Sequence, residues 1–178
     1  MATWNSRGLR GSTLEEFINQ TNERYYEAGL ALIQKIPTPI TPVKMDKEHR
    51  QITLAYFDQR STVDYIGVVQ GITVCFDAKE VLKDVIPLRN IHEHQVVFME
   101  QFEKQQGVAF LFIFFSNRNQ GYYMKFSEVL KFWQRGKEGG RKSIHYEELN
   151  PDYFVELKNG FMLPYLDTLN QDLSERES

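Results

Sequence analysis

The chain has only one cysteine, Cys75, and no long apolar run among its 178 residues. A single cysteine excludes an internal disulfide and also excludes a cysteine cluster that could bind zinc. The apolar run at 108–115 is far shorter than the roughly 20 residues of a membrane-spanning helix, so it predicts a buried strand. The N-terminal residues lack the apolar stretch of a secretion signal. We therefore expect a cytoplasmic protein in which Cys75 is a small strand residue.

Positive charge is also scarce. The 21 Lys and Arg residues are outnumbered by 24 Asp and Glu residues, and the formal net charge is −3. The balance is uneven: residues 1–146 hold 19 basic and 16 acidic residues, whereas residues 147–178 hold 2 and 8. Because a local basic surface matters more for nucleic-acid binding than the total charge, this composition still permits a DNA partner.

The length predicts one domain that is large enough for a hydrophobic core. Residues 1–11 are small and polar, and they predict a flexible arm that carries Arg7 and Arg10. We expect a single folded domain over 12–173 and a frayed C-terminus over 174–178.

Local patterns predict a central sheet with helices around it. Capping signals at Ser12 and Asn90 predict helices to Gly29 and Gln106, and Ser127 predicts a short helix to Trp133. A weaker helical segment is expected at 143–149. The expected strands cover 31–36, 51–57, 108–115 and 122–126. This order is typical of a mixed α/β sandwich. The segment 37–50 holds three prolines and should project from the core, with 51–57 as its return strand.

The most informative segment is STVDYIGVVQGITVCFDAKE, residues 61–80. Two apolar, β-branched runs flank Gln70 and Gly71, which predicts a β-hairpin with a two-residue turn. In that register Val69 lies opposite Ile72, and Asp64 lies opposite Asp77. Opposed residues have Cβ atoms roughly 5 Å apart, and like charges there repel each other. A divalent cation between the two carboxylates would remove this repulsion.

The same register brings two more polar residues to this face. Lys79 shares the face of Asp77 because the two are separated by one residue on a strand, and Thr62 lies opposite Lys79. Carboxylates suit Mg²⁺, which retains waters and contacts substrate phosphates and acidifies a bound water. Lys79 could stabilise phosphoryl charge in the transition state. The group therefore indicates phosphodiester hydrolysis, although such a pattern also marks ordinary solvated strand faces.

Gln95 is a further candidate ligand. It falls on a helix face that is otherwise apolar and formed by Ile91, Phe98 and Phe102. A glutamine on such a face needs a polar partner, which could be a metal, a metal-bound water or a backbone group. His92 and His94 are expected on the surface or in contact with phosphate.

Several exposed cations are candidates for DNA contacts. The glycine-rich segment 135–142 could bind DNA phosphates without sequence preference, or it could be only a soluble loop. The candidate residues are Arg7, Arg10, Lys44, Lys47, Arg50, Arg135, Lys137, Arg141 and Lys142.

The hairpin resembles the core of PD-(D/E)xK nucleases, and the wider chain is similar to the RecU family of Holliday junction resolvases. The matching segments are NSRG (5–8), TLEEFINQTN (13–22), KIPTP (35–39), AYFDQRSTVDY (55–65), FDAKE (76–80), PLRNIHEHQ (87–95) and FWQRGKEGGRKSI (132–144). They occur in order along nearly the whole chain. The resemblance implies a restriction-endonuclease-like fold with a central mixed sheet, flanking helices and a protruding stalk at 37–60.

The resemblance also implies a site and an activity. Thr62, Asp64, Asp77 and Gln95 would bind Mg²⁺ or Mn²⁺, and Lys79 would stabilise the transition state. The enzyme would be a homodimer that cuts paired strands of a four-way junction in recombination and repair, with its stalk in the junction centre. A C₂ dimer suits this task because it presents two identical sites. Recombinase or branch-migration proteins are possible partners.

Two departures favour a phage-borne or diverged member of the family. Asp77 stands where the family usually has Glu. The long basic arm that is common in the family before the NSRG segment is also not expected in this protein. Two other functions stay open: a nuclease of the same fold that acts on other branched or linear DNA, and a non-catalytic DNA-binding protein that modulates recombination.

Overall fold

The computed structural model describes residues 13–57, 62–160 and 162–177. The predicted arm with Arg7 and Arg10, and the capping residue Ser12, lie outside the described residues. In the described part, no helix is both long enough and apolar enough to cross a membrane.

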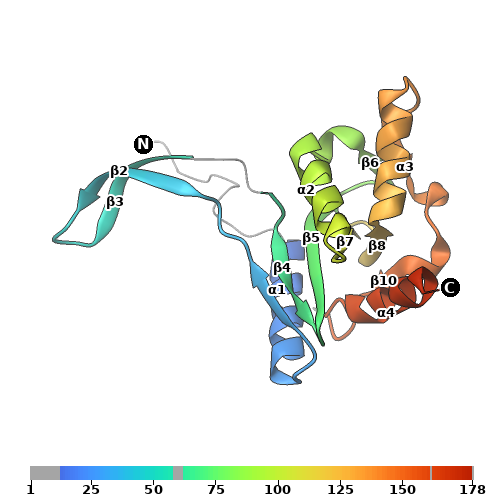
Figure 1. The fold of residues 1–178 in the computed structure, drawn as a ribbon, viewed down its shortest axis with the longest axis horizontal. Helices are drawn as coiled ribbons and strands as arrows, with labels where there is room; N and C mark the ends of the chain where they lie inside the picture. Colours follow the sequence, from blue (N-terminus) through green and yellow to red (C-terminus); the bar gives the residue numbers. More distant parts are fainter. Residues whose placement is uncertain (1–12, 58–61, 161, 178) are drawn as a thin grey trace.

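A six-stranded mixed sheet forms the centre of the molecule (Figure 1). Its strands, in spatial order, are β1 (Leu32–Lys35), β4 (Tyr65–Val69), β5 (Ile72–Val81), β7 (Val108–Phe115), β8 (Gln120–Lys125) and β10 (Phe154–Glu156). The β5–β7 pair is parallel and the other neighbours are antiparallel. The parallel pair needs a crossover, which the chain makes through a helix.

Helices cover both faces of the sheet. They are α1 (Thr13–Glu27), α2 (Glu93–Lys104), α3 (Phe126–Lys137) and α4 (Tyr165–Arg176). Phe76 of β5 contacts Tyr165 of α4 with ring centroids 5.3 Å apart. The next residue, Asp77, points to the other face and bonds to Gln95 of α2. Alternation along β5 therefore places α1 and α4 on one side and α2 and α3 on the other.

Within the described residues, two small sheets and three 3₁₀ turns accompany the central sheet. The strands β2 (Ile40–Asp46) and β3 (Gln51–Phe57) pair with each other, as do β6 (Val85–Pro87) and β9 (Ser143–His145). The 3₁₀ turns are η1 (Leu88–Asn90), η2 (Tyr146–Glu148) and η3 (Pro151–Tyr153).

The apolar run at 108–115 is strand β7, with the predicted bounds, and all eight of its residues are buried. A strand that is covered by helices on both faces shows a continuous apolar run rather than alternation. The sandwich of a mixed sheet and flanking helices is thus confirmed.

The β2–β3 hairpin projects from the body of the molecule (Figure 1) and is the predicted stalk. Neither strand has a buried residue. Its exposed apolar side chains are Ile40, Val43, Met45, Ile52, Leu54, Tyr56 and Phe57. The strand register shifts between Pro42 and Lys44, where proline cannot donate a ladder hydrogen bond.

Three helix predictions were wrong in extent or type. Helix α2 begins at Glu93, because residues 88–90 form the separate turn η1. Helix α3 begins at Phe126 and continues to Lys137, so Ser127 lies inside its first turn. The pair of glycines that follows, with Gly139 at φ 87°, ends this helix. Of the segment predicted to be helical at 143–149, residues 143–145 instead form β9, which pairs with β6, whereas Tyr146–Glu148 form the 3₁₀ turn η2.

Helix α4 has no counterpart in the sequence prediction, which placed a frayed end at 174–178. The helix continues to Arg176, whose guanidinium forms ion pairs with Asp172 and Glu103. Asp172 in turn accepts a hydrogen bond of 2.9 Å from the Tyr123 hydroxyl of β8. These contacts between α4, α2 and the sheet hold the end of the helix in place.

Candidate active site

The predicted register of the β4–β5 hairpin is confirmed from Val69–Ile72 to Tyr65–Phe76. Its turn residues Gln70 and Gly71 both have positive φ, 47° and 92°. Such a turn matches the twist of paired strands and requires a left-handed conformation at both positions. The hairpin ladder ends at Tyr65, so Asp64 lies one residue beyond it.

Asp64 is held at this end of β4 by two hydrogen bonds. Its backbone oxygen accepts from the Ile36 N–H at 2.8 Å. Its carboxylate Oδ2 accepts from the Ala78 N–H of β5 at 3.0 Å. The half-buried Asp64 side chain therefore reaches over to β5, next to Asp77.

Asp77 is fully buried on β5, at 0% exposure. Its Oδ1 accepts a hydrogen bond of 2.7 Å from Gln95 Nε2, and its Oδ2 forms an ion pair of 2.6 Å with Lys79 Nζ. This buried oxygen therefore lies against a positive charge, as a buried carboxylate requires.

The pKa of Asp77 is raised to about 7, mainly by burial; Lys79 opposes this rise, and the nearby Asp64 carboxylate contributes to it. Burial acts in this direction because it penalises the charged form of a carboxyl group. A bound divalent cation would favour the ionised form of Asp77 over the protonated form, as the positive charge of Lys79 does.

Gln95 lies buried on the first turn of α2, and both ends of its side-chain amide are engaged. The amide nitrogen donates to Asp77. The amide oxygen accepts from the His92 N–H at 3.2 Å, at the start of the helix. In this arrangement Gln95 both orients Asp77 and caps a backbone group, and its role as a metal ligand stays a prediction.

The donor set fits a hard divalent cation. Asp64 and Asp77 supply carboxylate oxygens from neighbouring strands. No group of three or more His, Cys, Asp or Glu in the described part could hold a metal. Mg²⁺ is typically held by one or two carboxylates, with waters and substrate phosphates as its other ligands. The residues present therefore fit Mg²⁺ better than a metal that needs a full protein cage.

Thr62 is half-buried, two residues before Asp64. Its predicted position opposite Lys79 lies beyond the confirmed ladder. Among the described residues, Thr62 forms no hydrogen bond with the other predicted ligands Asp64, Asp77 and Gln95. Its role as a metal ligand therefore stays a prediction.

The basic segment 135–142 is only partly a loop, since Arg135 and Lys137 belong to α3. Arg135 and Arg141 both pair with Glu148, whose pKa falls to about 2, mainly through the hydrogen bond from Arg135. Lys137 pairs with Glu93 at 2.6 Å. These carboxylates compete with DNA phosphates for the cations, so much of this positive charge is engaged within the protein.

Two cations of this region have no such competitor. Lys142 and Arg89 are exposed, and neither forms an ion pair within the described residues. Arg89 lies in the turn η1 and is absent from the candidates above, because an isolated arginine has no distinguishing sequence pattern. The other candidates, Lys44, Lys47 and Arg50, are exposed on the β2–β3 hairpin.

Comparison with known proteins gives consistent matches over most of the chain. A family model described as recombination protein U, RecU, matches residues 9–171. A protein named Holliday junction resolvase RecU from Lactobacillus delbrueckii subsp. bulgaricus is 40% identical over 174 residues, covering 94% of this chain and 82% of that protein. The protein of the same name from Lactococcus lactis subsp. lactis is 42% identical over 169 residues, covering 92% and 78%.

Among solved structures, the Holliday junction resolvase Hjc of Archaeoglobus fulgidus is similar with a TM-score of 0.41 and 10% identity. The match covers 65% of this chain and 75% of Hjc.

Proposed function

The chain belongs to the RecU family, and from this membership and the site geometry we propose that it is a metal-dependent endonuclease that resolves four-way DNA junctions in recombination and repair. Relatives named Holliday junction resolvase RecU cover most of the chain at about 40% identity. The observation that carries the proposal is the group formed by Asp64, Asp77, Lys79 and Gln95. A buried carboxylate that faces a second carboxylate and a lysine has the chemistry that phosphodiester hydrolysis needs.

In this mechanism Asp64 and Asp77 would hold Mg²⁺, with Mn²⁺ as a possible substitute. When bound, the metal supplies charge neutralisation at the scissile phosphate and a more acidic water. Gln95 fixes the orientation of Asp77 through the 2.7 Å hydrogen bond. Lys79, only 18% exposed, places its ammonium where negative charge develops on the phosphoryl oxygens.

We propose that two copies act together. A junction has approximate two-fold symmetry, and a C₂ dimer presents two sites at a defined spacing for symmetric cuts. The β2–β3 hairpin, with both strands unburied and Lys44, Lys47 and Arg50 on its surface, suits insertion into the open centre of a junction. Recombinase or branch-migration proteins would meet the complex there.

Cleavage of matched substrates tests the activity. We expect the protein to cut a synthetic four-way junction in Mg²⁺, to stop when the metal is chelated, and to leave a linear duplex of the same sequence intact. Equal cutting of both substrates would indicate a less selective nuclease of this fold. Junction binding without cutting in either Mg²⁺ or Mn²⁺ would indicate a non-catalytic DNA-binding role.

Metal binding tests the site separately. We expect Asp64→Asn to weaken Mg²⁺ or Mn²⁺ binding at least about tenfold, the scale seen for changes around metal ligands, because one of two carboxylates is lost. Isothermal titration calorimetry measures this directly. Asp167→Asn is the matched control, since Asp167 is exposed on α4. Unchanged affinity in Asp64→Asn would move the metal away from this carboxylate.

A further inference from the structure

A cavity of about 470 Å³ opens between the turn η1 and the C-terminal end of α3. Pro87, Leu88 and Ile91 form one apolar wall, and Trp133 with Gly136 of α3 forms the other. We name this cavity the η1–α3 slot. Its volume lies within the range of roughly 300–1,000 Å³ that is typical of small-ligand sites.

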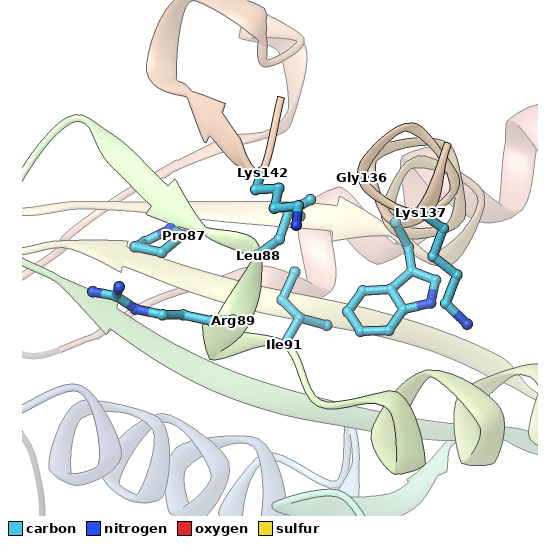
Figure 2. A pocket seen from close by; sticks show the side chains of 8 residues that line it. Pro87, Leu88, Arg89, Ile91, Gly136, Lys137 and Lys142 are labelled. Atoms are coloured by element: carbon cyan, nitrogen blue, oxygen red, sulfur yellow. The ribbon is translucent and has the colours of Figure 1, made fainter. Parts of the chain in front are cut away.

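The rim of the slot is basic. Arg89, Lys137 and Lys142 line it, and Figure 2 shows Arg89 and Lys137 at opposite ends with Leu88 and Ile91 between them. Lys137 is paired with Glu93. Arg89 and Lys142 have no carboxylate partner within the described residues, so both can meet an anionic ligand.

Gly136 allows α3 to pack closely against the turn η1. A Cβ atom at this position would lie 2.6 Å from Leu88 Cδ1, so a larger residue would displace the Leu88 side chain, which lines the slot. Trp133, one turn earlier on α3, is only partly buried. The slot therefore combines apolar walls, unpaired cations and a partly exposed indole, whose ring centroid lies 5.5 Å from Lys137 Nζ.

The slot is adjacent in the chain to the catalytic group. Ile91 lines the slot, and the next residue, His92, donates its backbone N–H to Gln95. Gln95 in turn holds Asp77. The hydrogen bonds of His92 and Gln95 therefore connect the wall of the slot to Asp77.

We propose that the η1–α3 slot takes an unpaired nucleobase from the strand being cut, with the flanking phosphate on Arg89 and Lys142. This inference rests on the proposed function. Every nucleotide brings one apolar π-face and one phosphate, which match the indole and the basic rim. Stacking of a base on an aromatic side chain tolerates any sequence, and extruding a base from a duplex costs a few kcal/mol, which such contacts can offset.

A bound peptide fits the slot less well. A peptide that binds by β-strand addition needs free backbone groups as hydrogen-bond partners. The Leu88 N–H already donates to the Lys142 carbonyl at 3.0 Å, and the Ile91 N–H donates to the Leu88 carbonyl at 3.0 Å. Pro87 has no N–H. The lining therefore offers a π-face and charge rather than a backbone ladder.

Fluorescence of 2-aminopurine placed beside the cut site of a synthetic junction tests the proposal. In a Lys79→Ala background, which prevents cutting, we expect binding to change this emission, because the base exchanges its neighbours in the duplex for the Trp133 indole. Adding Trp133→Ala should alter this change and weaken junction affinity about tenfold or more. Trp133→Phe, which keeps an aromatic face, should retain most of both. The folding of each variant is checked by thermal unfolding.

The cations are tested by the salt dependence of junction affinity. Arg89→Ala and Lys142→Ala should each lower the slope of log affinity against log salt by about one. Lys131→Ala is the control, because this exposed lysine of α3 lies outside the slot and lines a different groove. Its slope and its 2-aminopurine signal should match the parent.

The outcomes separate the two proposals. Suppose that the enzyme with Lys79 intact cuts junctions, and that Trp133→Ala leaves junction affinity, the 2-aminopurine signal and the cleavage rate as in the respective parent proteins. The slot proposal is then overturned and the proposed function stands. That result would favour a protein segment as the occupant. If the intact enzyme neither binds nor cuts junctions, the proposed function fails and the slot proposal fails with it.

Discussion

Replacing Lys79 by alanine is expected to slow cleavage of a four-way junction by about 10²–10³-fold, the typical loss when one preorganised charge stabiliser is removed. Lys79 Nζ lies 2.6 Å from Asp77 Oδ2, and its positive charge is the main influence that opposes the rise of the Asp77 pKa. The variant loses both the cation proposed to face the phosphoryl oxygens and the charge that lowers the Asp77 pKa.

Junction binding should persist in Lys79→Ala. The side chain is 18% exposed, whereas DNA affinity depends on exposed cations that contact phosphates. Single-turnover cleavage of a labelled junction and fluorescence anisotropy measure the two properties separately. Lys83→Ala is the matched control, because this substitution removes the same charge from a lysine that is exposed in the loop after β5. A near-parental cleavage rate in Lys79→Ala would refute its catalytic role.

Replacing Phe110 by alanine is expected to lower the free energy of unfolding by about 3–5 kcal/mol, the range for large-to-small changes in a core. Phe110 is fully buried on β7. Its ring stacks on Phe76 at 4.6 Å and on Tyr123 at 4.2 Å. Since a domain of this size is typically stable by only about 5–15 kcal/mol, the variant should lose a large part of its stability.

Urea unfolding measures this loss. Phe110→Leu should cost clearly less, because it keeps most of the buried apolar volume. Phe57→Ala, on the projecting hairpin where the ring is 76% exposed, should change stability by no more than about 0.5 kcal/mol. A small effect of Phe110→Ala would mean that the aromatic stack is not central to the core.

Strands with a strong local pattern could be predicted from the sequence. Strand β7 has the predicted bounds because eight consecutive apolar residues suit only a strand covered on both faces. Strand β3 also has the predicted bounds. The β4–β5 register follows from one turn, because a two-residue loop determines every later pair.

Segments whose structure depends on distant partners could not be predicted in this way. Residues 143–145 have no strong strand pattern, and they form β9 only because β6 lies beside them. Helix α4 has weak amphipathic character, and it is held by contacts of Tyr165 with Phe76 and of Arg176 with Glu103. Such contacts join residues far apart in the chain, which local spacing does not reveal.

The sequence alone determined that Asp64, Asp77 and Lys79 lie together at one end of a hairpin, because pairing in a β-hairpin is a local property. Only the tertiary structure decided how these residues are held. Burial under α2 raises the Asp77 pKa, and the capping bond to His92 turns the Gln95 amide nitrogen toward Asp77. The tertiary structure also pairs Arg135, Lys137 and Arg141 with carboxylates. It places Arg89 and Lys142 beside the η1–α3 slot without such a partner among the described residues. These differences arise because desolvation and ion pairing depend on which elements pack together.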